Sequence, residues 1–171
     1  MTQDPNDGLQ RLWTPYRMAY ITGERDADRH LEKGCPFCAM RQAQDDDLVV
    51  HRGDEVFAVL NLHPYNPGHL MVLPYRHVGD LEELTDTESA EVSAVTTAAV
   101  RTLRAISAPD AFNIGLNLGS AAGGSLSAHL HQHVVPRWVG DANFITVIGG
   151  TKTLPQLLED TRDLLVKEWC G

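Results

Sequence analysis

The chain has 171 residues, of which 43% are hydrophobic, and carries a formal net charge of −9 with a pI near 5.2. This length suits one domain with its own core, and the acidic balance argues against a broad basic surface for nucleic acid. No stretch approaches the roughly 20 apolar residues of a membrane-spanning helix, so neither nucleic acid nor a membrane is an expected partner.

The N-terminal part is polar up to Gln10 and shows no apolar signal core, so we expect a cytoplasmic protein. Of the three cysteines, Cys35 and Cys38 lie close together and Cys170 stands near the end. This distribution favours metal or redox chemistry over a disulfide framework. We expect a single domain made of an N-terminal arm, a core and a C-terminal extension, over residues 1–47, 48–138 and 139–171.

Hydrophobic runs between turn residues predict most of the secondary structure. In chain order, strands are predicted over residues 48–52, 55–62, 69–74, 111–118 and 128–136. A helix is predicted over residues 86–107, because Thr85 and Glu88 form a capping box and Ala108-Pro109 ends it. A last helix is expected from Leu154, with Thr153 and Gln156 in capping-box register and Pro155 in its first turn. The predicted fold is α+β, with a mainly antiparallel sheet of about five strands and two main helices.

Three histidines alternate in the strand over residues 128–136. On a strand, His129, His131 and His133 project from one face with neighbours about 7 Å apart. Mutual repulsion lowers the pKa of such imidazoles, and a neutral imidazole is both a nucleophile and a metal ligand. Three explanations are open at this point: a polar face of a half-exposed strand, a metal site made of all three, or a catalytic row.

A glycine-rich turn over residues 119–125 precedes the histidines. Gly119, Gly123, Gly124 and Ser125 can aim successive backbone N–H groups at an anion. Placed beside the histidines, this turn would hold a phosphate against His131. It therefore favours transfer of a phosphorus-centred group, with His131 as the nucleophile, over a metal site made of the three histidines.

Several motifs together are similar to those of a known family. With residues 129–135 (HLHQHVV), residues 67–74 (PGHLMVLP) and Asn61 before them, the chain resembles the histidine-triad (HIT) family of nucleotide hydrolases and transferases. The outer segments, over residues 12–18, 136–138 and 140–144, resemble its actinobacterial diadenosine tetraphosphate phosphorylases. The resemblance implies a dimer with a continuous sheet. It also implies a nucleotide and inorganic phosphate as small-molecule partners.

The resemblance assigns roles residue by residue. It implies that His131 attacks the α-phosphorus, that His133 binds phosphate oxygens and that His129 supports the strand. Asn61 would hold the ribose hydroxyls, and His69 would orient the catalytic strand or be a buried structural histidine. Further expected substrate contacts are Phe57, Leu60 and Met71 beside an adenine ring, unless these three are ordinary core, and Trp138.

One departure from the family concerns the turn before the histidines. Many members have a glutamine there, where this chain has Gly124-Ser125. Its absence argues against simple hydrolysis, and Asn117 can offer an amide to an incoming phosphate ion. We therefore expect phosphorolysis of diadenosine tetraphosphate to ATP and ADP. A hydrolase or phosphoramidase of the same family, or a nucleotide-binding sensor with slow turnover, remain alternatives.

Cys35 and Cys38 have the spacing of zinc ligands, but a zinc site needs about four ligands. The resemblance supplies the other two, His77 and His129. Four protein ligands leave no open position, so the expected cofactor is a structural Zn²⁺. A redox pair is the rival explanation.

The helix over residues 86–107 is apolar on more than one side. Its apolar residues include Val92, Val95, Val100 and Leu103. Part of this helix is expected to face a second subunit of a homodimer.

Overall fold

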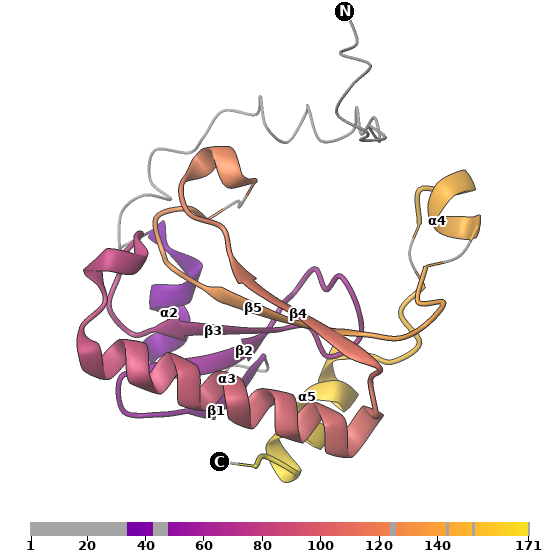
Figure 1. Ribbon diagram of the computed structural model, residues 1–171, viewed down its shortest axis with the longest axis horizontal. Helices are drawn as coiled ribbons and strands as arrows, with labels where there is room; N and C mark the ends of the chain where they lie inside the picture. The colour runs from indigo at the N-terminus through magenta and orange to yellow at the C-terminus, as the bar shows by residue number, and fades with distance from the viewer. Residues whose placement is uncertain (1–33, 43–47, 124–125, 143, 152, 171) are drawn as a thin grey trace, which may run out of the picture.

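The computed structural model describes residues 34–42, 48–123, 126–142, 144–151 and 153–170. A five-stranded antiparallel sheet lies at its centre, with the strands in the order β1-β2-β3-β5-β4 (Figure 1). The strands are β1 (Val49–Arg52), β2 (Val56–Leu60), β3 (Leu70–Pro74), β4 (Ala111–Leu116) and β5 (Gln132–Arg137). The helices are α2 (Pro36–Gln42), α3 (Asp86–Ser107), α4 (Phe144–Ile148) and α5 (Leu158–Lys167), with short 3₁₀ turns at Leu81–Glu83 and Ser120–Ala122. The predicted α+β class and antiparallel sheet are confirmed.

Helix α3 begins and ends where the sequence predicts. The Thr85 hydroxyl accepts a hydrogen bond from the Glu88 amide at 3.1 Å, and the Glu88 carboxylate accepts one from the Thr85 amide at 2.8 Å. This reciprocal capping box satisfies amide groups that the first turn would otherwise leave unpaired. At the other end, Ala108 adopts a left-handed conformation with φ 43°, which stops the helix before Pro109.

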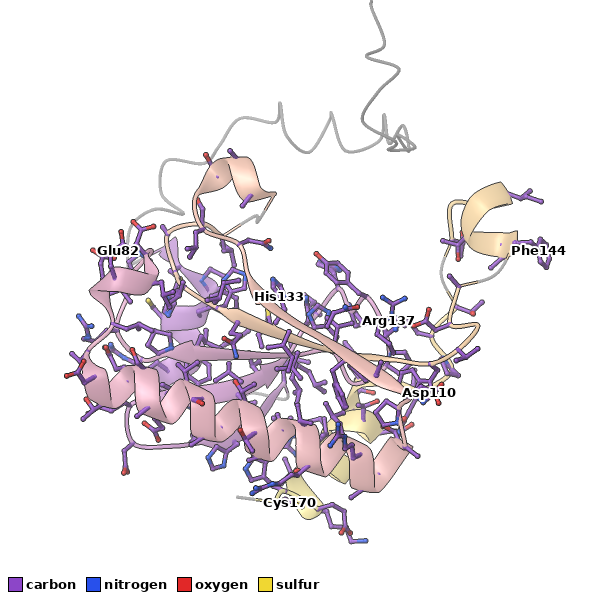
Figure 2. The ribbon with its side chains drawn as sticks, in the orientation of Figure 1. Glu82, Asp110, His133, Arg137, Phe144 and Cys170 are labelled. Carbon is purple, nitrogen blue, oxygen red and sulfur yellow. The ribbon has the colours of Figure 1, made fainter. Side chains whose placement is uncertain are left out.

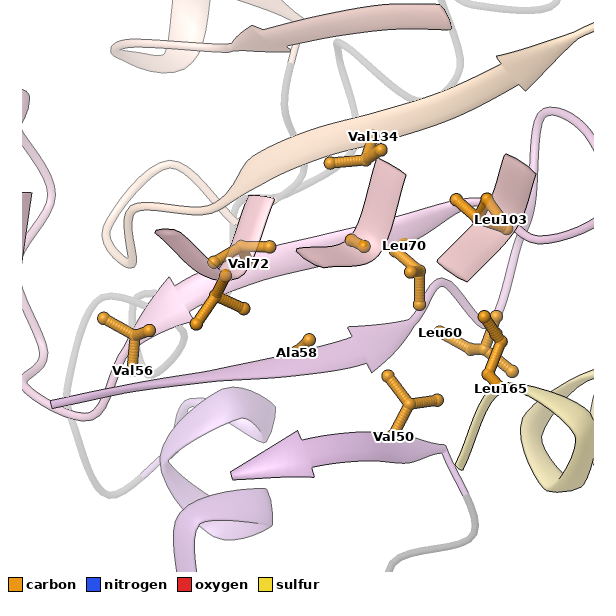
Figure 3. Close-up of a cluster of buried hydrophobic side chains, with 11 residues drawn as sticks. Val50, Val56, Ala58, Leu60, Leu70, Val72, Leu103, Val134 and Leu165 are labelled. Atoms are coloured by element: carbon orange, nitrogen blue, oxygen red, sulfur yellow. The ribbon is translucent and has the colours of Figure 1, made fainter. Parts of the chain in front are cut away.

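The main core lies between one face of the sheet and helices α3 and α5. Its buried side chains are aliphatic (Figure 3): Val50, Val56, Ala58, Leu60, Leu70, Val72, Val95, Ala99, Leu103, Val134 and Leu165. A second buried cluster covers the opposite face beside α2. It contains Cys35, Phe37, Cys38, Val49, Phe57, Val59, Met71 and Leu73. The inner strand β2 is buried along its whole length because both faces are covered.

Two predicted boundaries are wrong. Strand β5 begins at Gln132 and not near residue 128, since Val72↔Gln132 is the last pair that it forms with β3. Pro74 lies two positions after Val72 on β3. It has no amide hydrogen with which to continue the hydrogen bonds between β3 and β5. Helix α5 begins at Leu158 and not near residue 154, and no capping box forms there. Leu157 is the N-cap residue, so Pro155 lies outside the helix and not in its first turn.

Among the described residues, no helix combines the length and the apolar character needed to cross a membrane.

Candidate active site and metal centre

The three predicted histidines lie close together but do not form a single row. The rings of His131 and His133 are neighbours, with centroids 5.0 Å apart. His129 lies before β5, and its Nδ1 approaches Cys35 Sγ at 3.4 Å and Cys38 Sγ at 3.5 Å. His129 therefore lies outside the strand that was predicted to carry it, although Phe37 contacts both its ring and that of His131.

His131 is held in one tautomer by its own backbone. Its Nδ1 lies 2.7 Å from the carbonyl oxygen of His129. A carbonyl can only accept a hydrogen bond, so Nδ1 carries the proton and Nε2 carries a lone pair. Burial lowers the pKa of His131, and only 7% of the residue is exposed. His131 is thus a neutral imidazole with an oriented, unprotonated nitrogen.

A chain of hydrogen bonds sets the tautomer of His133 as well. The Tyr65 amide donates to His69 Nδ1 at 3.1 Å, so His69 carries its proton on Nε2. That nitrogen lies 2.9 Å from His133 Nδ1, which must accept. The proton of His133 is therefore on Nε2. The side-chain amide nitrogen of Asn117, 3.4 Å away, is also a donor and cannot accept this proton, so Nε2–H is left for another acceptor. His133 is built to donate a hydrogen bond.

Both histidines of this hydrogen-bonded pair are neutral at physiological pH. Burial, and then the nearby His133 and His131, lowers the pKa of His69 to about 3. Burial, followed by His131, lowers the pKa of His133 to about 4. A neutral His133 with its proton on Nε2 can still donate one hydrogen bond to a phosphate oxygen.

Asn61 comes directly after β2 and lies beside this pair. Its Oδ1 accepts a hydrogen bond from the His63 amide at 2.9 Å, and its Nδ2 lies 3.4 Å from His69 Nδ1. The structure therefore places Asn61, the expected ribose-binding residue, beside the His69–His133 pair.

A trough of about 510 Å³ opens beside His133. Strands β4 and β5 form its floor, and Asn117 and Gly123 line the end near the glycine-rich turn. Gly124 and Ser125, the other expected phosphate contacts, lie outside the described residues. The trough thus brings Asn117 and His133 together beside the described end of the glycine-rich turn.

The second cluster of functional groups lies on the side of His129. Cys35, Cys38, His77 and His129 place one ligand atom each within 4.8 Å of one another. The Cys38 Sγ to His77 Nδ1 distance is 3.3 Å. In a tetrahedral zinc site with ordinary bond lengths, sulfur and nitrogen ligands lie about 3.6 Å apart. The described spacing therefore fits a metal ion.

The protonation of His129 also suits metal binding. Its Nε2 lies 2.9 Å from the carbonyl oxygen of Pro74, so this nitrogen carries the proton and donates. The other nitrogen, Nδ1, faces the two sulfur atoms without a proton. A ligand histidine held by a backbone carbonyl is the usual arrangement around zinc. Cys35, Cys38 and Cys170 are free cysteines.

The comparisons with known proteins agree with this geometry. The HIT domain family matches residues 42–139, more than half of the chain. The chain belongs to the HIT family. The AP-4-A phosphorylase of Mycobacterium tuberculosis is 60% identical over 167 residues, which cover 95% of this chain and 86% of that protein.

Solved HIT structures share the fold. A zinc-bound histidine triad family protein from Mycobacterium smegmatis has a TM-score of 0.67 and 28% identity, covering 81% of this chain and 94% of that one. A hypothetical histidine triad nucleotide-binding protein from Sulfolobus tokodaii has a TM-score of 0.65 at 23% identity, covering 78% and 91%. The second likeness shows the fold alone.

Four expected substrate contacts lie elsewhere in this HIT protein. Phe57 is 0% exposed and stacks on Tyr75, and Leu60 is 1% exposed in the core against α3. Met71 is also buried, so the ordinary-core explanation fits all three. The indole of Trp138 donates to the Ser107 carbonyl at 3.2 Å and lines a separate apolar cavity, not the trough.

One residue near His131 was not predicted. Phe37 stands between Cys35 and Cys38 in sequence, and its ring centroid is 5.5 Å from that of His129 and 5.2 Å from that of His131. It therefore connects the metal centre to His131 by direct contact. Its position inside the Cys-Pro-Phe-Cys motif was the available signal, but an aromatic residue there is equally typical of a core.

Proposed function

We propose that this HIT protein cleaves diadenosine tetraphosphate with inorganic phosphate to give ATP and ADP. The 60% identity to AP-4-A phosphorylase over 95% of the chain supports this substrate and reaction. The observation that carries the mechanism is the 2.7 Å contact between His131 Nδ1 and the His129 carbonyl, because it leaves Nε2 unprotonated. Nucleotidyl transfer needs such an oriented nucleophile.

In the first step, His131 Nε2 attacks the α-phosphorus of one adenosine. A phosphorus–nitrogen bond forms, the bond to the bridging oxygen breaks, and ATP leaves with that oxygen. His133 Nε2–H donates to a non-bridging oxygen, where negative charge grows in the transition state. The product is adenylyl-His131.

In the second step, an oxygen of inorganic phosphate attacks the same phosphorus. The phosphorus–nitrogen bond breaks, its electron pair returns to Nε2, and ADP leaves. We assign Asn117 to the incoming phosphate, together with Gly124 and Ser125. The amide of Asn117 supports this assignment because it lines the trough at His133.

We propose that Cys35, Cys38, His77 and His129 hold a structural Zn²⁺. The donor set and its spacing support zinc, and a HIT protein with the same fold is zinc-bound. When bound, zinc cross-links α2 to the segment before β5 and supplies no open coordination position. Thiolate ligands also support the cytoplasmic location that we propose, since that compartment keeps cysteines reduced.

We propose a homodimer that forms through the edge strand β4. Strand β4 pairs only with β5 among the described strands, and Ile114 on it is 49% exposed. Its sequence, AFNIGL, carries no charge or proline that would prevent pairing with another edge. The expected partner face on α3 does not support the dimer, because Val92, Val95, Val100 and Leu103 pack against the protein's own core. Light scattering should give twice 18.8 kDa for the wild type and 18.8 kDa for Ile114→Lys.

The reaction is tested by its products. We expect ATP and ADP from diadenosine tetraphosphate when phosphate is present, and little turnover without it. AMP and ATP formed at equal rates with and without phosphate would identify a hydrolase and contradict the proposal. Tight binding with almost no turnover in either case would identify a sensor.

The Asn117→Ala variant separates the two steps. We expect phosphorolysis to fall about tenfold or more, while formation of adenylyl-His131 in a single turnover changes less. An equal loss of rate in both steps would show that Asn117 does not bind the incoming phosphate. Thr97→Ala is the control, because Thr97 is an exposed polar residue on α3, across the sheet from the trough.

A further inference from the structure

The trough extends well beyond the reacting centre. His133, Val135 and Arg137 all line it, and they are alternate residues of β5 that share one face. Figure 2 shows His133 and Arg137 following one another along this strand. Four residues of strand span about 13 Å, so the trough reaches far past the phosphorus that His131 attacks.

The floor of the trough leaves room for a ligand. Gly115 on β4 lies opposite His133, and a Cβ atom at Gly115 would meet no atom within 4 Å. The next pair on this face of the sheet is Asn113↔Val135. The space above this part of the sheet is therefore not occupied by core side chains.

The lining of the trough is suited to an anion. Among the described residues that line it, Arg137 is the only permanent charge, none is a carboxylate, and three are asparagines: Asn66, Asn113 and Asn117. In a chain with a net charge of −9, a site with this composition differs from the average surface. Guanidinium and amide donors are the groups that bind phosphate oxygens.

Arg137 is held rigidly at its end of the trough. Asp141 accepts hydrogen bonds from its Nε at 2.6 Å and its Nη2 at 3.0 Å. Asn66, which is 1% exposed, donates to Asp141 at 2.7 Å and to the Pro136 carbonyl at 2.8 Å. The third nitrogen of Arg137, Nη1, donates to Asn113 Oδ1 at 2.8 Å.

This network leaves donors for a ligand. A guanidinium has five N–H groups, and the three contacts to Asp141 and Asn113 use three of them. The side chain remains 44% exposed. An oriented arginine with remaining donors needs little reorganisation to bind an anion.

We propose that Arg137 and Asn113 form a subsite for the distal phosphates of the dinucleoside polyphosphate, the part that leaves as ATP. This subsite rests on the proposed function, because it takes His131 as the point of attack. It predicts a preference for substrates with several phosphates: the reacting phosphate binds at His133, and the phosphates beyond it reach Arg137.

The alternative is that Arg137 only fixes the turn after β5. Asp141 also accepts from the Trp138 amide at 3.3 Å, so the ion pair contributes to this turn in any case. The two explanations differ for ligands of different length. A turn-stabilising role would weaken every nucleotide equally, whereas a distal subsite affects only those with more than one phosphate.

Calorimetry with AMP and ATP on the zinc-loaded protein tests the proposal. For Arg137→Gln we expect ATP to bind about tenfold or more weakly, as for a lost charge-assisted hydrogen bond, and AMP to bind within about twofold of wild type. Diadenosine tetraphosphate is measured in the His131→Ala background, where we expect no turnover. There, Arg137→Gln should weaken its binding by the same factor as it weakens the binding of ATP. Arg101→Gln is the charge-matched control, because Arg101 is exposed on α3, across the sheet from the trough.

Equal weakening of AMP and ATP, or no weakening of either, would overturn the subsite. An Arg137→Lys variant that keeps the melting temperature but recovers only part of the ATP affinity would support it, since lysine keeps the charge and loses the fork. If wild-type protein cleaves diadenosine tetraphosphate equally well without phosphate, the proposed reaction fails. The different effects of Arg137→Gln on ATP and AMP affinity would then still show whether the distal phosphate subsite exists.

Discussion

One face of the sheet packs against α3 and α5 with aliphatic side chains, whereas the opposite face carries the cysteines, the histidines and Phe37. Strand β5 takes part in both. Val134 is buried in the aliphatic core, and Gln132 donates to Thr96 of α3 at 2.7 Å. On the other face, His131 and His133 contact each other, and His131 also contacts Phe37.

The difference shows how a short segment can hold reactive groups rigidly. The aliphatic face anchors β5 by burial, which is not directional and tolerates small changes in shape. The histidine face depends on hydrogen bonds that each define a tautomer, as between His131 Nδ1 and the His129 carbonyl. Changes on this second face should therefore affect activity and metal binding more than packing.

The largest effect is expected for His131→Ala. Removing the nucleophile should lower kcat by at least about 10³-fold, while nucleotide affinity stays within a few fold. His133→Ala should be milder, because it removes charge stabilisation worth about 2–4 kcal/mol and not the covalent step. Acid-quenched reactions analysed by mass spectrometry should place the nucleotide on His131. A label on any other residue would refute the mechanism.

Loss of the metal centre should affect the whole fold. We expect Cys38→Ser to lose zinc, measured by elemental analysis, and to melt at a clearly lower temperature, because metal binding contributes to folding free energy. Cys170→Ser is the control, since Cys170 is exposed and outside the cluster. Wild-type protein purified without chelators and free of metal would contradict the assignment.

Acid should destabilise the protein below about pH 6.5. Burial lowers the pKa values of His69 and His133 from the ordinary 6.5 of an exposed histidine to about 3 and about 4 in the folded protein. Between the folded and the unfolded pKa values, the unfolded chain binds more protons than the folded protein does. The stability present above pH 6.5 is therefore lost as the pH falls through this range. Thermal denaturation at about pH 7.5 and about pH 5 measures this loss. A melting temperature that rises on acidification would contradict the neutral His69–His133 pair.

The smallest effect is expected for Phe37→Leu. The loss of the flat ring beside His131 should lower kcat about tenfold, with KM and zinc content unchanged. Phe57→Leu is a matched control, because Phe57 belongs to the same buried cluster but stacks on Tyr75. Equal losses of kcat and melting temperature in the two variants would show that Phe37 is only a core residue.

The sequence by itself determined most of the elements and which residues the candidate site contains. Alternation and capping residues place β2, β3 and α3 within one or two residues of their predicted ends, since these signals are local. The spacing in Cys-Pro-Phe-Cys and in the histidine segment identified the reactive groups, because those residue types have few other uses in such density.

Only the tertiary structure decided what each histidine does. Periodicity treats His129, His131 and His133 alike, but β3 ends at Pro74, so the chain turns before β5 and His129 faces the cysteines. The His69–His133 contact joins residues 64 positions apart, and no local pattern encodes such a pair. Arg137 likewise becomes part of the trough because β4 and β5 pair in one register, which depends on the packing of the whole sheet.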